Sequence, residues 1–323
     1  MAQLSESLQQ RLTLNDPAAV AQTLVEQLRA TVRGLRLRGV VVAVSGGVDS
    51  ATCLGIAARA FGPERTLGLF LPDKHSGPES APLAQEVCEA FGVPLEVVDI
   101  TDALTALGCY TRQDRAVAAR AAGFDPEHDR FRVDFRQDFA DPDSLPTFGL
   151  TVVKADGSTQ RHTLTGQTYL ELVAATNMKQ RTRMLLTHFH AESRNHAVVG
   201  TSNRLEIEQG FFVRYGDGTG DYFPLRSMLK SQVYALGTAL GVPASILGRE
   251  PTTDTYSAPQ SQEDFFYGMP LAVNDALWDA FVAGEPLEKV AEGVGEPVAW
   301  VQAVFASYAR RRTLAERLSV NAL

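Results

Sequence analysis

The sequence has 323 residues, 45% of them hydrophobic and 21% charged, which is enough for one large hydrophobic core. A formal net charge of −8 gives no general attraction for nucleic acid or for a membrane surface, so we expect neither as a partner. The sequence contains no apolar run of a membrane span's length, no signal-peptide pattern and no closely spaced cysteine pair. These features predict a cytoplasmic protein.

The first predicted elements alternate between helices and strands. Residues 16–34 have Asp16 and Pro17 at a helix start, followed by apolar residues at four-residue spacing. Next come a buried strand over 40–44, a helix up to about Ala60, and two short strands, RTLGLFLP and PLEVVDI, on either side of another helix. This alternation is typical of a parallel sheet covered on both faces. We therefore predict an α/β fold with a doubly wound parallel sheet.

Residues 110–170 interrupt the alternation. The segment 147–166 predicts a β-hairpin with its turn at Ala155-Asp156-Gly157-Ser158, whereas the charged and aromatic stretch before it has no clear period. We interpret 110–170 as an insertion within a single domain that spans 1–323. After it, HAVVGTS predicts a strand, SMLKSQVYALGTALGVP predicts a helix, and the C-terminal part predicts helices that stop near Gly284 and Gly293.

The clearest functional motif lies where the first strand turns into a helix, at Ser45-Gly46-Gly47-Val48-Asp49-Ser50. Glycines at such a turn let backbone N–H groups converge on an anion, and the helix N-terminus adds partial positive charge. The two serine hydroxyls supply further donors, and Asp49 could hold a magnesium ion that neutralises phosphates. The Walker pattern G-x-x-x-x-G-K-[ST] is absent from the sequence. The motif therefore predicts a nucleotide phosphate loop of a different kind.

This loop resembles the pyrophosphate loop of the ATP pyrophosphatase family. Further segments are similar to the ammonia-dependent NAD synthetases within that family: NMKQRTRM (177–184), VGTSNRLE (199–206), GFFVRYGDGTGD (210–221), and Pro224-Leu225 with Lys230 and EPTTD (250–254). The resemblance implies the adenine nucleotide alpha hydrolase-like fold. It also implies that ATP adenylates the carboxylate of deamido-NAD with release of pyrophosphate, and that ammonia then displaces AMP to give NAD.

The resemblance also implies roles for the matching residues. Those that would bind ATP are Ser45, Gly46, Gly47, Asp49, Ser50, Thr201, Lys230 and Thr252. Those that would bind the dinucleotide are Asn177, Arg181, Arg214 and Asp221. Asp49 and Glu206 would hold Mg²⁺, and Lys230 and Arg181 would stabilise charge in the transition state. The family further implies a homodimer.

Three features depart from the family pattern. Arg214 stands where the family has lysine, the insertion is longer than the usual connection, and a run of Arg310, Arg311 and Arg312 stands where a His-Lys pair is usual. The insertion could be a lid that excludes water or part of a dimer interface, and one of these arginines could replace the pair. We expect free ammonia as the nitrogen donor, because no glutaminase segment with a nucleophilic cysteine precedes the first strand.

Alternative interpretations of the sequence assign another function to the same site. The same chemistry could act on nicotinate mononucleotide or on an unrelated acid. A regulatory protein that only binds ATP would have little need for the carboxylates of Asp49 and Glu206, and a tRNA-modifying enzyme would need a basic surface or more cysteines. His188, His190 and His196 are not expected to form a metal site, since positions two apart do not share a helix face.

Overall fold

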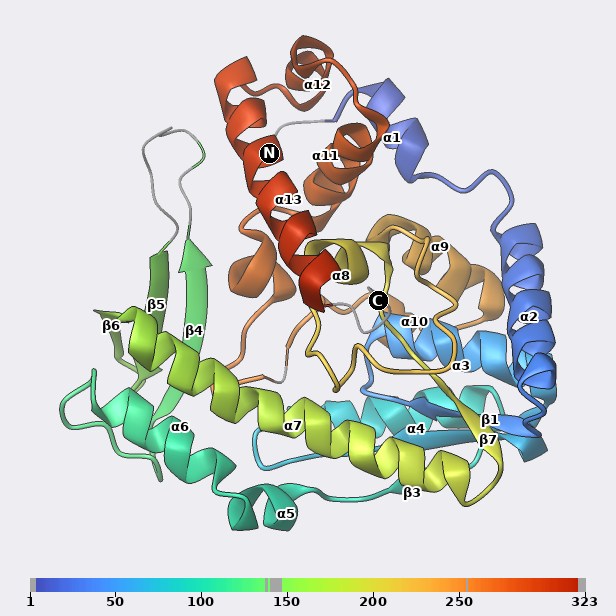
Figure 1. Cartoon of the computed structure of the whole chain (residues 1–323), viewed down its shortest axis with the longest axis horizontal. Coiled ribbons are helices and arrows are strands. Elements are labelled where there is room, and N and C mark those ends of the chain that lie inside the picture. Colours follow the sequence, from blue (N-terminus) through green and yellow to red (C-terminus); the bar gives the residue numbers. More distant parts are fainter. Residues whose placement is uncertain (1–3, 137–138, 140–146, 254, 319–323) are drawn as a thin grey trace.

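The computed structural model describes residues 4–136, 139, 147–253 and 255–318 (Figure 1). Asp254 and most of the segment 137–146 therefore lie outside the described residues. The elements in chain order are α1 (Glu6–Leu12), α2 (Pro17–Gly34), β1 (Gly39–Ala43), α3 (Val48–Phe61), η1 (Pro63–Arg65), β2 (Thr66–Phe70), α4 (Ser80–Ala90), β3 (Leu95–Val97), α5 (Thr101–Ala106), α6 (Cys109–Ala118), β4 (Arg130–Arg136), β5 (Thr147–Val153), β6 (Thr159–Thr163), α7 (Gly166–Glu192), β7 (His196–Val199), α8 (Arg204–Gln209), α9 (Lys230–Leu240), α10 (Ala244–Leu247), the π-helix η2 (Glu263–Tyr267), α11 (Leu271–Ala283), α12 (Leu287–Val294) and α13 (Val298–Leu318).

The parallel sheet has the strand order β3-β2-β1-β7, and every pairing in it is parallel. Val40 and Val42 of β1 pack in one hydrophobic cluster with residues of α2, α3 and α9. Val41, which points to the other face, packs with residues of α5 and α7. Helices therefore cover both faces, and the predicted doubly wound sheet is confirmed.

The predicted helix ends of this layer are confirmed as well. Asp16 caps α2 by accepting the N–H of Ala19 at 2.9 Å. Gly62 follows α3 with a φ of 76°, a conformation that glycine adopts without steric cost. Because β1 is followed by a four-residue turn and then by α3, the phosphate loop lies at the carboxyl edge of the sheet, where α/β proteins bind ligands.

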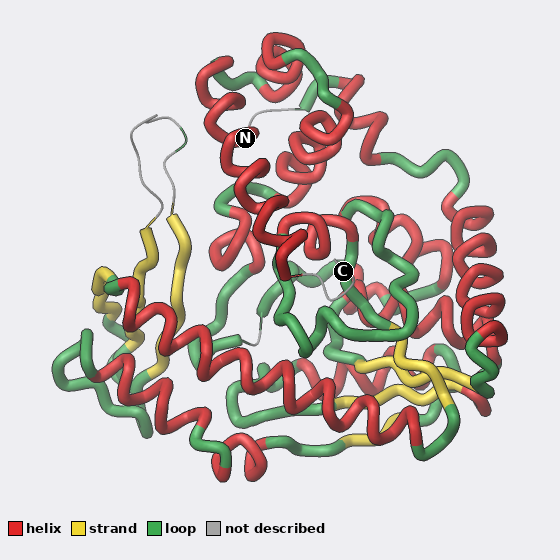
Figure 2. Tube along the Cα trace, viewed as in Figure 1, coloured by secondary structure: helices red, strands yellow, loops and turns green. Residues whose placement is uncertain are grey.

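The inserted segment forms a second sheet, antiparallel, with the order β4-β5-β6. The predicted hairpin is confirmed, and its turn is closed by the N–H of Lys154, which donates to Ser158 O at 2.8 Å. β4 is a strand that we did not predict, although Phe131 and Val133 alternate with charged residues along it. Figure 2 shows the two sheets at opposite ends of the long helix α7.

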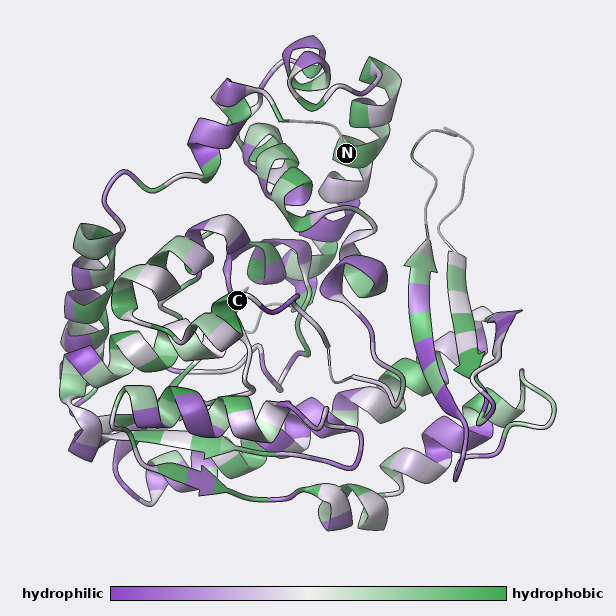
Figure 3. Ribbon diagram, turned by 180° about the vertical axis from the view of Figure 1, so that it is seen from behind, coloured by the Kyte–Doolittle hydropathy of each residue, from purple (hydrophilic) through white to green (hydrophobic). Residues whose placement is uncertain are grey.

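The C-terminal helices α11, α12 and α13 pack with α1 around a separate core that includes Trp278 and Tyr308. Figure 3 shows hydrophobic residues both in this bundle and around the parallel sheet. The predicted stops near Gly284 and Gly293 are confirmed, because Gly284 caps α11 and α12 ends at Val294 with Gly295 as its cap. Within the described ranges, no helix is long and apolar enough to cross a membrane.

Candidate functional site

The loop between β1 and α3 is closed by its own serine side chains. The hydroxyl of Ser50 donates to Gly47 O at 3.0 Å and accepts the N–H of Ser45 at 3.2 Å. Gly46 has a φ of 77°, and a Cβ at this position would lie 2.9 Å from the Cβ of Leu83 in α4. Glycine at Gly46 is therefore required both by the backbone and by the neighbouring helix, and the loop is held by its own side-chain hydrogen bonds.

Three predicted site residues from three helices meet beside this loop. One carboxylate oxygen of Asp49, in α3, forms an ion pair with the ammonium group of Lys230, at the start of α9. Its other oxygen accepts a hydrogen bond from Nδ2 of Asn203 at 3.0 Å. Asn203 caps α8, and its backbone N–H donates to Glu206 at 3.1 Å. Asn203 thus connects the two predicted metal ligands.

Sequence reasoning missed the role of Asn203. The available signal was the pattern Asn-x-x-Glu over 203–206, which is typical of a capping box at a helix start. Its reciprocal bonds fix the first turn of α8 and therefore the position of Glu206.

The charges in this group strongly affect one another. Burial, with the negative charge of Asp49, raises the pKa of Glu206 to about 8. Burial lowers the pKa of Lys230, but the charges of Asp49 and Glu206 outweigh this and leave that pKa raised, so Lys230 is a cation at neutral pH. Two carboxyl groups face a single cation, and an additional positive charge would be stabilised there.

The donor set of Asp49 and Glu206 fits a hard divalent cation. Both side chains offer carboxylate oxygens, which Mg²⁺ prefers, and Mg²⁺ usually takes only one or two protein carboxylates, with phosphate and water as its other ligands. Among the described residues, no group of three or more His, Cys, Asp or Glu side chains could hold a metal ion by itself. The pair therefore suits a metal that arrives with nucleotide phosphates.

Two of the predicted dinucleotide-binding residues, Arg181 of α7 and Arg214 of the segment after α8, are in contact. Nε of Arg181 donates to the carbonyl of Arg214 at 3.3 Å. Asn177 lies one helical turn before Arg181, so the two share a face of α7. Asp221 is placed differently, because its carboxylate accepts the N–H of Val198 in β7 at 2.7 Å, and one of its oxygens is therefore used by the fold.

The two predicted ATP-binding threonines lie in separate segments. Thr201 follows the end of β7 and is half-buried. Thr252 is exposed and forms an isolated antiparallel bridge with Ser261. Among the described residues no hydrogen bond joins either side chain to the phosphate loop, so their ATP contacts remain predictions.

A second charged group lies after β2, at the same edge of the sheet. The buried carboxylate of Asp73 accepts from Lys179 at 3.1 Å and from Arg183 at 2.7 Å, both in α7. Lys179 also contacts Nδ1 of His75 at 3.1 Å and the carbonyl of Thr255 at 3.2 Å. This group was not predicted, because its members are about a hundred residues apart in the chain.

Of the three arginines near the C-terminus, Arg311 points inward. Its guanidinium donates to Gln209 at 3.0 Å and to Phe266 O at 3.1 Å, and it lies 5.4 Å from the ring of Phe135 in β4. Arg310 and Arg312 are exposed. Because Gln209 belongs to α8, Arg311 attaches the last helix to the helix that carries Glu206.

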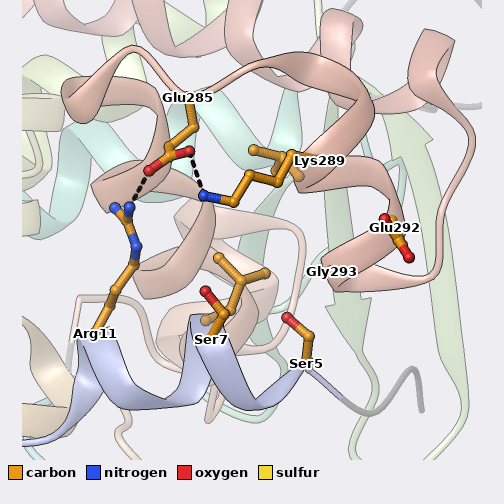
Figure 4. A pocket seen from close by; sticks show the side chains of 9 residues that line it. Ser5, Ser7, Arg11, Glu285, Lys289, Glu292 and Gly293 are labelled. Carbon is orange, nitrogen blue, oxygen red and sulfur yellow. Dashed lines mark hydrogen bonds and ion pairs between the residues drawn. The ribbon is translucent and has the colours of Figure 1, made fainter.

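The cavity shown in Figure 4 lies elsewhere, between α1 and α12, and has a volume of about 250 Å³. Its two cations, Arg11 and Lys289, both pair with Glu285. A second cavity, of about 480 Å³, is lined by residues that include Arg204, Tyr222 and Arg226. Neither cavity includes a predicted site residue, and both lie outside the nucleotide site.

Comparison with known proteins agrees with the motifs. The family model described as NAD synthase matches residues 20–144 and 150–312. The NH(3)-dependent NAD(+) synthetase of Rhizobium meliloti (strain 1021) is 40% identical over 297 residues, which is 92% of this chain and 88% of that protein. The protein of the same name from Thermococcus kodakarensis is 28% identical over 303 residues, 93% of this chain and 96% of that protein.

Solved structures show the same fold. An NMN synthetase from Francisella tularensis matches with a TM-score of 0.63 at 22% identity, over 92% of this chain and 96% of that one. An NH3-dependent NAD synthetase from Campylobacter jejuni matches with a TM-score of 0.59 at 17% identity, over 93% of this chain and 96% of that one. At such identities the likeness concerns the fold alone, but the family model spans most of the sequence. The chain belongs to the NAD synthase family.

Proposed function

We propose that this protein makes NAD from deamido-NAD, ammonia and ATP, and that it releases AMP and pyrophosphate. The observation that carries the proposal is the meeting of Asp49, Glu206 and Lys230 beside the phosphate loop, in a chain of the NAD synthase family. A protein that only bound ATP would have no use for paired carboxylates next to a buried lysine.

The reaction requires activation because a carboxylate has no good leaving group. The nicotinate carboxylate attacks the α-phosphorus of ATP, a C–O–P linkage forms, and the bond to pyrophosphate breaks. Ammonia then attacks the activated carbonyl carbon, the C–O bond to AMP breaks, and one proton is lost from nitrogen. The protein supplies position and charge and needs no nucleophile of its own.

We assign the residues of the site to the two larger substrates, ATP and the dinucleotide. The departing pyrophosphate would be held by Ser45, Gly46, Gly47 and Ser50. The rest of ATP would be bound by Thr201 and Thr252. Lys230 would stabilise the negative charge that develops on the phosphates. Asn177, Arg181, Arg214 and Asp221 would hold the dinucleotide.

Asp49 and Glu206 would hold Mg²⁺. When bound, the ion would neutralise phosphate charge and so favour attack by an anion. The raised pKa of Glu206 agrees with this role, because its carboxylate forms readily only when more positive charge is near.

The test is an assay of product formation. The protein with Mg-ATP and ammonium is offered deamido-NAD, nicotinate mononucleotide or a panel of other carboxylates, while AMP, ADP and pyrophosphate are measured. We expect AMP, pyrophosphate and NAD from deamido-NAD. ADP in place of AMP would contradict the chemistry, AMP with nicotinate mononucleotide alone would change the substrate, and no turnover would favour a binding protein.

We also propose that the chain is one domain with 110–170 inserted in it and that it forms a homodimer in the cytoplasm. Leu185 and Phe189 lie one turn apart on α7 and are 65% and 61% exposed, so a second copy could cover them. All three cysteines are free and buried, as expected in a reducing compartment.

A further inference from the structure

The outer edge of the inserted sheet is covered by a distant part of the chain. β4 is an edge strand, and the backbone groups of alternate residues along such a strand point away from its partner. The N–H of Phe131 donates to Oγ of Ser257 at 2.9 Å, and the carbonyl of Phe131 accepts the N–H of Ala258 at 2.9 Å. Two residues further along β4, the carbonyl of Val133 accepts a hydrogen bond from Nε2 of Gln260 at 3.0 Å. The chain from Ser257 to Gln260 therefore occupies this edge of the sheet.

A buried ring attaches the same part of the chain to the core of the insertion. Tyr256 is 3% exposed and belongs to the hydrophobic cluster that the inserted sheet forms with α6 and α7. The centre of its ring lies 5.5 Å from that of Phe131 in β4 and 5.7 Å from that of Phe265 in η2. The carbonyl of the preceding residue, Thr255, accepts a hydrogen bond from Nζ of Lys179 at 3.2 Å. This part of the chain is therefore attached both to the insertion and to α7.

The attached residues in turn hold the short stretch that carries Thr252. The N–H of Thr253 donates to the carbonyl of Gln260 at 2.9 Å, and the carbonyl of Pro251 accepts the N–H of Gln262 at 2.9 Å. Thr252 lies between these two bonds, in an isolated antiparallel bridge. The backbone is thus fixed on both sides of Thr252, whereas its side chain is exposed.

We propose that the inserted sheet positions Thr252 for ATP, an inference that rests on the proposed function, which places Thr252 on ATP. The edge of β4 holds residues 257–260, and these hold residues 251–253. A binding group that is in place for only part of the time lowers the apparent affinity for its ligand by that fraction. Ser257 and Gln260 are therefore positioning residues, which act on ATP binding through Thr252.

The first experiment removes both side-chain anchors from the whole chain. Ser257→Ala combined with Gln260→Leu takes away two hydrogen bonds to the edge of β4. We expect the KM for ATP to rise about tenfold, the scale of losing two hydrogen bonds, with kcat and the KM for deamido-NAD unchanged. Ser257→Thr keeps the hydroxyl group and should keep the wild-type KM for ATP. An unchanged KM for ATP in the double variant, or an equal rise in both KM values, would overturn the proposal.

Asp156→Ala is the control within the inserted sheet. The side chain of Asp156 also accepts a single backbone N–H, that of Ser158, but in the turn between β5 and β6. This variant should leave both KM values unchanged. Hydrogen exchange measured by mass spectrometry tests the anchoring without any substrate, because a peptide that covers 255–262 should exchange faster in the double variant than in the wild type or the control. Equal exchange in the three proteins would show that the edge of β4 does not hold these residues, which would overturn the proposal.

A third experiment asks whether the anchors act through Thr252. Thr252→Ala alone should raise the KM for ATP. In that background the two anchor substitutions should add less than about twofold, because the hydroxyl group that they would misplace is already gone. Effects that multiply in full, or no effect of Thr252→Ala, would overturn the proposal.

Calorimetric titration with Mg-ATP separates this inference from the proposed function. Weaker binding by the double variant, in a protein that does not amidate deamido-NAD, would contradict the proposed function alone. Equal affinity of the wild type and the double variant would contradict the inference alone, and no binding of Mg-ATP by the wild type would contradict both.

Discussion

At the scale of single residues, Asp49 is the side chain on which the site depends most. It pairs with Lys230, accepts from Asn203 and lies close enough to Glu206 to raise the pKa of that carboxyl group. We expect Asp49→Asn to lower kcat by at least about 100-fold, the scale of losing a preorganised electrostatic contact. Steady-state kinetics measures this, with circular dichroism to verify the fold. Asp102→Asn, at an exposed position of α5, is the control, and equal activity of the two variants would contradict the assignment.

His75 predicts how stability depends on pH. Burial, with the positive charge of Lys179, lowers its pKa to about 3 from the usual 6.5. As the pH falls below 6.5, His75 is therefore protonated in the unfolded chain but stays neutral in the folded one. The free energy of unfolding then decreases by about 1.4 kcal/mol per pH unit until the pH approaches 3. Between pH 7 and pH 5, the free energy of unfolding measured with urea should fall by about 2 kcal/mol less in His75→Gln than in the wild type. An equal decrease in the free energy of unfolding of the two proteins between these pH values would refute this prediction.

At the scale of elements, local sequence signals predicted much of the fold. Asp16 and Gly62 mark helix ends through interactions within a few residues, and the hairpin turn at 155–158 is equally local. The strand β4 was hidden because its charged residues form ion pairs across the sheet. Asp134 pairs with Arg161 of β6, on the far side of β5, and only the folded sheet shows this.

The candidate site, like the fold, has parts that the sequence could predict and parts that it could not. The phosphate loop could be predicted because its chemistry lies in six consecutive residues, 45–50. The contacts of Asp73 with Lys179 and Arg183 could not, since a charge pair between distant segments leaves no periodic pattern in a single sequence. The inward turn of Arg311 among three adjacent arginines was equally unpredictable, because it depends on which face of α13 meets α8.

The attachment of α13 gives a prediction at this scale. Arg311 makes two hydrogen bonds to α8 and η2, whereas the neighbouring Arg310 is exposed. We expect Arg311→Ala to lower the free energy of unfolding by about 2 kcal/mol, because it leaves polar partners without hydrogen bonds. Arg310→Ala should change it by less than about 0.5 kcal/mol. Urea titration measures both, and equal losses would show that the inward contacts do not hold the helix.

At the scale of the whole molecule, α7 runs from the inserted sheet to the parallel sheet. It begins beside the inserted sheet, carries Lys179 and Arg183 against Asp73, presents Arg181 to the turn at Arg214, and ends beside β7 (Figure 1). Glu96 of β3 anchors its far end through His190 and Arg194. The helix therefore carries Asn177 and Arg181, which would bind the dinucleotide, between the two sheets.

The exposed face of α7 gives a prediction about the proposed homodimer. Phe189 is 61% exposed, and a charge there would have to be buried if a second copy covers this helix. We expect Phe189→Glu to halve the molar mass measured by light scattering after gel filtration and to leave the circular dichroism spectrum unchanged. Leu314→Glu, at a position 53% exposed on α13, adds the same charge away from α7 and should leave the mass unchanged. A wild-type protein that is already monomeric, or a dimer that tolerates Phe189→Glu, would exclude α7 as the interface.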